Sequence, residues 1–179
     1  MYKTDTKKLA VMGLLTAIVV VLQIVVHIQI GIFSLSTVLI PIVIGGALYG
    51  VLAGAWLGLV FAAAVFISGD AAFFLGITIP GTIVTVTAKG IACGAAAAAV
   101  YRLFVKKNRQ LAGLMASIAA PVVNTAVFII GCLIFFNYGM AYILTAFVGI
   151  NFFIELAFNI LLSQVVMFII NYARRRVTN

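Results

Sequence analysis

Acidic residues are scarce in this sequence: Asp and Glu together number three in 179 residues, and charged types make up only 8%. A soluble domain carries charge on about a quarter of its residues, so the composition excludes that class. No Asp, Glu, Lys or Arg occurs between Lys8 and Asp70 or between Arg109 and Glu155. Apolar runs of this length are typical of membrane-spanning helices, which need about 20 residues each. We therefore expect one polytopic membrane domain over residues 1–179.

Motifs of the common enzyme classes are missing as well. No phosphate-binding loop of the type GxxxxGK[ST] occurs, so the chain is not expected to hydrolyse ATP by itself. Neither HExxH nor GxSxG nor a cluster of Cys and His is present, and we expect no metal, no cofactor and no catalytic residue. The two cysteines, Cys93 and Cys132, lie in apolar runs, where a small buried hydrophobic side chain is favoured over a disulfide.

Basic residues give the chain a formal net charge of +8, but they are confined to a few positions. Loops rich in Lys and Arg stay on the cytoplasmic face of a membrane. Such clusters indicate membrane topology and not a nucleic-acid partner. Ten of the eleven basic residues form three clusters, which are Lys3, Lys7 and Lys8; Arg102, Lys106, Lys107 and Arg109; and Arg174, Arg175 and Arg176.

Apolar runs and helix breakers predict an all-α membrane protein with six transmembrane helices in a compact bundle. Four expected spans separate the first basic cluster from the second, and two separate the second from the third. All three clusters therefore fall on one side, which predicts a multi-pass protein of the cell membrane with both termini cytoplasmic. Residues 31–36 are expected to form an outer loop. The expected spans cover residues 9–30, 36–48, 51–68, 80–102, 111–136 and 149–172.

Small residues one helical turn apart occur in three of the expected spans. Helices in lipid associate through close backbone approach, which this spacing permits. The sets are Gly50, Gly54 and Gly58; Gly90, Gly94 and Ala98; and Gly13 and Ala17. For the first two sets, packing within the chain is favoured. For Gly13 and Ala17, near the cytoplasmic end of the first span, packing within the chain and docking of a partner protein are equally open.

Polar side chains lie inside the expected spans, although an ionisable group at the centre of a bilayer costs about 3 kcal/mol. Asn151, Glu155 and Asn159 recur every four residues and share one face of the last helix. Lys89 lies near the middle of the fourth span, and Asn124 follows a proline whose ring frees a backbone carbonyl. Most of the set falls in the outer half or the middle of the membrane. This distribution indicates a polar pocket, open to the outside, for a small polar or zwitterionic solute. The candidate substrate-binding residues are Gln23, His27, Asp70, Lys89, Asn124, Asn151, Glu155 and Asn159.

Other interpretations of these residues stay open. Lys89 and Glu155 can neutralise each other as an internal ion pair. His27 at the end of a span is also typical of an interfacial histidine, and Asp70 beside Gly69 is also typical of a turn in an outer loop. As for the solute, Lys89 suits a carboxylate, while Asp70 and Glu155 equally permit a cationic or purely hydrogen-bonding ring compound.

The combination of six spans in 179 residues, the pair Gly13 and Ala17 after a basic N-terminal stretch, and the run GINFFIELAFN over 149–159 resembles a known family. The chain is similar to the substrate-binding S component of an energy-coupling factor (ECF) vitamin transporter. The resemblance implies that it binds a scarce vitamin from outside, beneath the loop after the first span. It also implies association with a transmembrane coupling protein and two cytosolic ATPases, and reorientation in the membrane to release the solute inside. In the family an Ala-xxx-Ala pair on the first helix meets the coupling protein, and Gly13 and Ala17 occupy that place here.

Two other functions remain as alternatives. A self-sufficient channel or facilitator for small solutes would need no partner chain. An intramembrane enzyme would use the carboxylates of Asp70 and Glu155 as an acid and base pair, although lone carboxylates outside a motif are a weak signal for catalysis.

Overall fold

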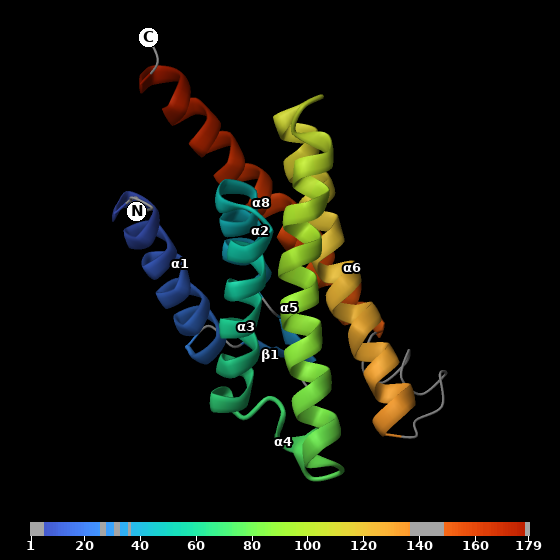
Figure 1. Ribbon diagram of the computed structural model, residues 1–179. Helices are drawn as coiled ribbons and strands as arrows, with labels where there is room; N and C mark the ends of the chain where they lie inside the picture. The colour runs from blue at the N-terminus through green and yellow to red at the C-terminus, as the bar shows by residue number, and fades with distance from the viewer. Residues whose placement is uncertain (1–5, 26–27, 31–32, 36, 137–148, 178–179) are drawn as a thin grey trace.

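The computed structural model describes residues 6–25, 28–30, 33–35, 37–136 and 149–177, and Figure 1 shows that helices dominate this part of the chain. The helices run side by side, with one short helix at the lower end of the view and one short hairpin above it, behind the bundle. The elements are α1 (Thr6–Ile24), β1 (Ile28–Ile30), β2 (Phe33–Leu35), α2 (Leu39–Tyr49), α3 (Val51–Ser68), α4 (Ala72–Leu75), α5 (Ile79–Phe104), α6 (Arg109–Phe135) and α8 (Gly149–Val177).

Apart from the four-residue α4, each described helix carries a longer apolar stretch and overlaps one of the six expected spans. Three of them, α3, α5 and α6, are long and apolar enough to cross a membrane by themselves. The other three carry shorter apolar stretches within the described residues, namely Lys8–Ile24, Leu39–Tyr49 and Phe152–Val165. The structure therefore confirms a bundle of helices whose length and composition suit a membrane protein, and α3 has the bounds that the sequence predicts.

The prediction for the end of the first span is wrong. The helix was expected to continue to Ile30, but α1 ends at Ile24, and β1 then pairs antiparallel with β2. Each strand places one polar residue between two apolar ones, and the polar residues Gln29 and Ser34 are direct partners in the register. This alternation has the period of a strand and not of a helix. The expected outer loop over 31–36 thus contains β2, and the second helix begins at Leu39.

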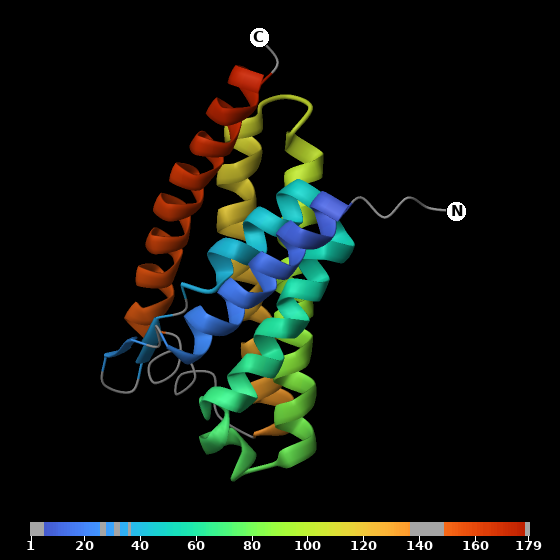
Figure 2. The same cartoon turned by 90° about the vertical axis from the view of Figure 1, so that its left-hand side faces the viewer.

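The ends of the helices divide the bundle into two poles. In Figures 1 and 2, α1 begins, α5 connects to α6 and α8 ends toward the same pole, while α4 and the β1–β2 hairpin lie toward the other. The connection between α5 and α6 is short, and the Asn108 side chain caps α6 by accepting hydrogen bonds from the backbone N–H groups of Gln110 and Leu111, at 2.8 and 3.3 Å. The basic clusters of the described chain are therefore gathered at one pole, as the topology argument requires.

The centre of the bundle is a backbone-to-backbone seam between α3 and α5. A Cβ atom added to Gly54 would collide with the carbonyl oxygen of Gly94, and one added to Gly58 would collide with the carbonyl oxygen of Gly90. The reverse additions collide in the same way. Glycine at these four positions is thus what allows the two helices to touch, and the expectation of packing within the chain is confirmed for both sets.

Candidate functional site

Lys89 places an ammonium group inside the bundle, between two aromatic rings. It lies on α5 and is half-buried. Its Nζ is 5.7 Å from the centre of the Phe61 ring on α3 and 5.3 Å from the centre of the Phe128 ring on α6. Both distances are within the range of a cation–π interaction, in which the negative face of the ring attracts the cation. The two rings therefore hold the positive charge without neutralising it.

Glu155 supplies the opposite charge from α8. Only 6% of this residue is exposed, and its Oε1 accepts no hydrogen bond from the described part of the chain. The carboxylate and the Lys89 ammonium attract each other electrostatically. A buried carboxylate oxygen without a donor is costly, because it has lost water and gained nothing in exchange.

Asn124 on α6 presents a second unpaired acceptor. It is 7% exposed, and its buried Oδ1 has no hydrogen-bond partner among the described residues. Phe128, one of the rings beside Lys89, follows Asn124 by one helical turn and therefore lies on the same face of α6. Helices α5, α6 and α8 thus contribute one cation and two unsatisfied oxygen acceptors to the interior of the bundle.

Asn159, one turn after Glu155 on α8, differs because its amide already has partners. Its Nδ2 donates to the backbone carbonyl oxygen of Ser117 at 2.6 Å, and Ser163 Oγ donates to its Oδ1 at 3.3 Å. The Ser117 carbonyl is available because Pro121, four residues later in α6, has no N–H to donate. Asn159 therefore joins α8 to α6 and fixes the height of Glu155 along the bundle.

Gln23 and Asp70 form a separate polar contact near the end of α3. Gln23 is 3% exposed, and its Nε2 donates to Asp70 Oδ2 at 2.5 Å and to Ser68 Oγ at 3.3 Å. Asp70 follows Gly69, whose φ of 85° ends α3 in the left-handed conformation. The pair thus fastens α1 to the end of α3, and the sequence did not predict that these two residues bind each other. The Asp70 charge still acts on Lys89 through space.

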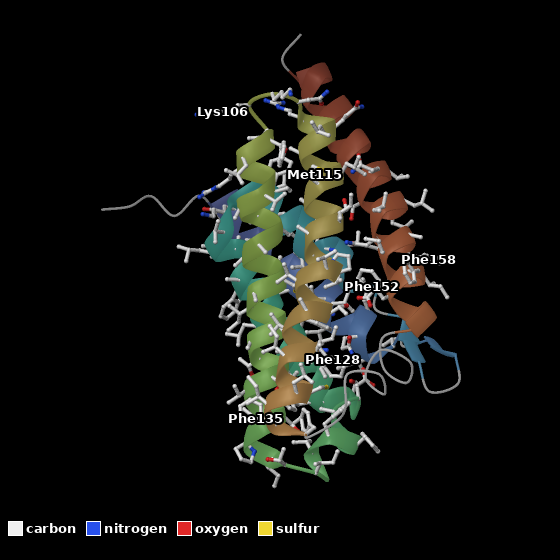
Figure 3. The ribbon with its side chains drawn as sticks, turned by 90° about the vertical axis from the view of Figure 1, so that its right-hand side faces the viewer. Lys106, Met115, Phe128, Phe135, Phe152 and Phe158 are labelled. Carbon is white, nitrogen blue, oxygen red and sulfur yellow. The ribbon has the colours of Figure 1, made fainter. Side chains whose placement is uncertain are left out.

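Two candidate residues cannot be placed in this way. His27 lies outside the described residues. Asn151 lies in the first turn of α8, and its side chain is outside the description. Phe61 and Phe128 were not predicted at all, and the one available signal was that Phe128 shares a helix face with Asn124. In Figure 3, Phe128 lies on α6, while Phe158 on α8 points away from the bundle and marks the outer side of that helix.

A comparison of the sequence with protein-family models identifies the chain. The model of the ECF transporter, substrate-specific component, matches residues 7–173. The chain belongs to this family. Comparison with curated proteins and with solved structures gave no match. The family is a transporter component and not an enzyme family, and the substrate-specific component is a multi-pass membrane protein.

In this substrate-specific component, the outer face of α1, meaning the side of the helix that points away from the bundle, is uncovered. A Cβ atom added to Gly13 would meet no other atom of the described chain within 4 Å, and Ala17 is exposed. Leu14 between them is 61% exposed, whereas Leu15 and Val19 are buried against the bundle. The pair Gly13 and Ala17 therefore forms a shallow apolar face that the described chain leaves uncovered.

Proposed function

We propose that this substrate-specific component captures a small water-soluble vitamin or related micronutrient from outside the cell and delivers it to the inside. The observation that carries this proposal is the set of Lys89, Glu155 and Asn124. An apolar bundle keeps a cation and two unpaired acceptors in its interior only at a cost, and a bound polar solute would recover that cost. Asp70 and Gln23 complete the proposed site at its outer end, with His27, Asn151 and Asn159 as further members.

The energy for delivery is proposed to come from two cytosolic ATPases through a transmembrane coupling protein. The chain has no phosphate-binding loop of its own, so any coupling to ATP requires other chains. The open face around Gly13 and Ala17 fits a helix of the coupling protein, because small residues one turn apart admit a close neighbour.

The proposed topology has six crossings in a single domain over residues 1–179, with both termini in the cytoplasm of the cell. Support comes from the gathering of basic segments at the pole where α1 begins and α8 ends, since Lys and Arg favour the cytoplasmic side. In this orientation α4 and the β1–β2 hairpin face the outside, where the solute enters.

Mass spectrometry of small molecules extracted from the detergent-purified chain tests the proposed site. The parent is compared with the double variant Lys89→Met, Glu155→Gln, which removes both charges, keeps the length of Glu155 and shortens Lys89 by one atom. The control is Phe158→Leu, at a residue that is 47% exposed on the outer side of α8. We expect one vitamin-sized compound, near one per chain, in the parent and the control and its loss in the double variant. Equal retention by the double variant would disprove the site.

Liposomes that contain the chain alone separate this function from the channel alternative. A binding subunit without its ATPases does not accumulate solute or pass it continuously, so we expect no sustained flux of the compound. Sustained flux through the chain alone would contradict the proposed function and favour a facilitator.

A further inference from the structure

Lys89 and Glu155 attract each other inside the bundle, and the charges of these two groups sum to zero. Lys89 is held by the rings of Phe61 and Phe128, and Glu155 is the strongest charged influence on it. Asp70, the other acidic residue that acts on Lys89, accepts a hydrogen bond from Gln23 at the end of α3. Asp70 keeps its negative charge but is bound to α1 there, so Lys89 and Glu155 are the pair of opposite charges from which the ligand is inferred.

These two groups do not satisfy each other. Glu155 Oε1 accepts no hydrogen bond from Lys89 or from any other residue that the structure describes. An ion pair that served only to neutralise two buried charges would be expected to use the oxygens of the carboxylate, since an unpaired buried oxygen costs free energy. The electrostatic attraction of Lys89 and Glu155 therefore leaves hydrogen-bonding capacity for a third group.

Asn124 on α6 and Glu155 on α8 each present an unsatisfied acceptor, whereas the unsatisfied Nε2 of Gln164, more than two turns after Glu155 on α8, is a donor. Glu155 Oε1 and Asn124 Oδ1 can each be satisfied only by an N–H or O–H group. Lys89, in contrast, offers only donors. A ligand that completes all three must present at least two donors toward α6 and α8 and an acceptor or an anionic group toward α5.

We propose that the ligand is a dipolar solute without net charge, with at least two N–H or O–H donors for Glu155 and Asn124 and an acceptor or carboxylate for Lys89. This inference rests on the proposed function and narrows its substrate class. A ligand with net charge would leave one charge uncompensated inside the bundle, where the penalty is larger than in water. A dipolar ligand without net charge adds no uncompensated charge to the bundle.

Affinity capture from a defined mixture tests this proposal. The full-length parent chain in detergent is incubated with the fraction of yeast extract below about 1 kDa, washed and eluted, and the retained compounds are identified by mass spectrometry. We expect one retained compound that is zwitterionic or neutral at pH 7 and carries at least two N–H or O–H groups. A retained compound with a net positive or negative charge would overturn the inference and leave the proposed function intact. Retention of no compound by the parent would overturn the proposed function itself.

Single variants make the charge argument independent of the compound's identity. For a net-neutral dipole, Lys89→Met and Glu155→Gln should each lower occupancy by at least about tenfold, since removing one partner of a buried charge pair costs several kcal/mol. A net anion would instead bind Glu155→Gln as well as or better than the parent, and a net cation would do so with Lys89→Met. Phe158→Leu should retain the parent's occupancy. A size-exclusion profile that matches the parent's profile shows that a variant is folded. Where a variant is not folded, the net charge of the compound that the parent retains decides the outcome.

Discussion

The α3–α5 seam and the outer face of α1 carry the same sequence pattern in opposite surroundings. In the seam, Gly54 and Gly58 lie against the backbone of α5, and a single added Cβ atom collides there with a carbonyl oxygen. On α1, Gly13 has the same spacing to its small neighbour Ala17, yet an added Cβ atom meets no atom of the described chain within 4 Å. The pattern shows where a helix can come close. It does not say whether that helix belongs to the same chain.

This difference assigns different work to the two regions. The glycines of the seam stabilise the fold, because they form the contact between α3 and α5. Glycine on the outer face contributes nothing to packing within the described chain, and it even lowers helix stability relative to alanine. A residue that costs stability and packs against nothing is best explained by a partner, which is the proposed role of this face.

The largest effect is expected from Gly58→Leu in the seam. The new side chain would need space that the backbone of Gly90 occupies, so α3 and α5 must separate. Overpacking of this kind costs at least about 3 kcal/mol when backbone must move. We expect loss of the monodisperse peak in size-exclusion chromatography after detergent extraction. A normal peak and a normal melting temperature would show that the seam is not the contact described.

A smaller change at the same seam sharpens the comparison. Gly94→Ala adds one methyl group against the backbone of Gly54, and the added carbon would also lie 3.1 Å from Ile42 Cγ2. We expect a loss of about 1–3 kcal/mol in the free energy of unfolding, since the two backbones must move apart to make room for the methyl group. Gly13→Ala is the matched control and should gain about 0.5–1 kcal/mol from helix propensity. Equal effects of the two substitutions would remove the distinction between the regions.

Much of the fold could be predicted from charge and hydropathy. Six apolar helices follow from runs of residues that water would not tolerate at a surface, and the basic clusters correctly predict which helix ends lie together. The β1–β2 hairpin was not predicted, because each of its strands has only three residues. An alternating pattern of that length is not recognisable within the 22 residues over 9–30 that were expected to form one helix. Because of this hairpin, α1 ends at Ile24 and not at the expected Ile30.

Less of the site could be predicted, because a residue type does not reveal its partners. Asn124 and Asn159 both lie in apolar helices, and the sequence treats them alike. The structure separates them, since Asn159 donates to the Ser117 carbonyl that Pro121 leaves free, while Asn124 Oδ1 has no described partner. The cost of burying a charge made Lys89 a candidate, but nothing in the spacing predicted that Phe61 would lie beside it.

The inner face of α1 gives an intermediate effect. Gln23→Ala removes the hydrogen bonds to Asp70 and Ser68 that fasten α1 to the end of α3. Because polar contacts between membrane helices contribute little on average, we expect a loss of about 1 kcal/mol. Trp56 on α3, the only tryptophan of the sequence, donates from Nε1 to Thr16 Oγ1 of α1 at 3.3 Å. Its fluorescence therefore reports on the separation of α1 from α3 during thermal unfolding. An unchanged melting temperature would mean that α1 is held by its apolar contacts alone.

The smallest effect on the isolated chain is expected from Gly13→Leu, which makes this variant the sharpest test of the comparison. The same substitution that disrupts the seam at Gly58 should here leave the free energy of unfolding within about 0.5 kcal/mol or raise it slightly, because the side chain enters open space and leucine favours helix. Ligand occupancy of the purified chain should be unchanged, since Gly13 is not among the residues of the proposed site. Uptake of the ligand by cells that also express the coupling protein and ATPases should fall by at least about tenfold, because leucine fills the face that a neighbouring helix must approach. Normal uptake with normal stability would show that the open face meets lipid and that the coupling protein binds elsewhere.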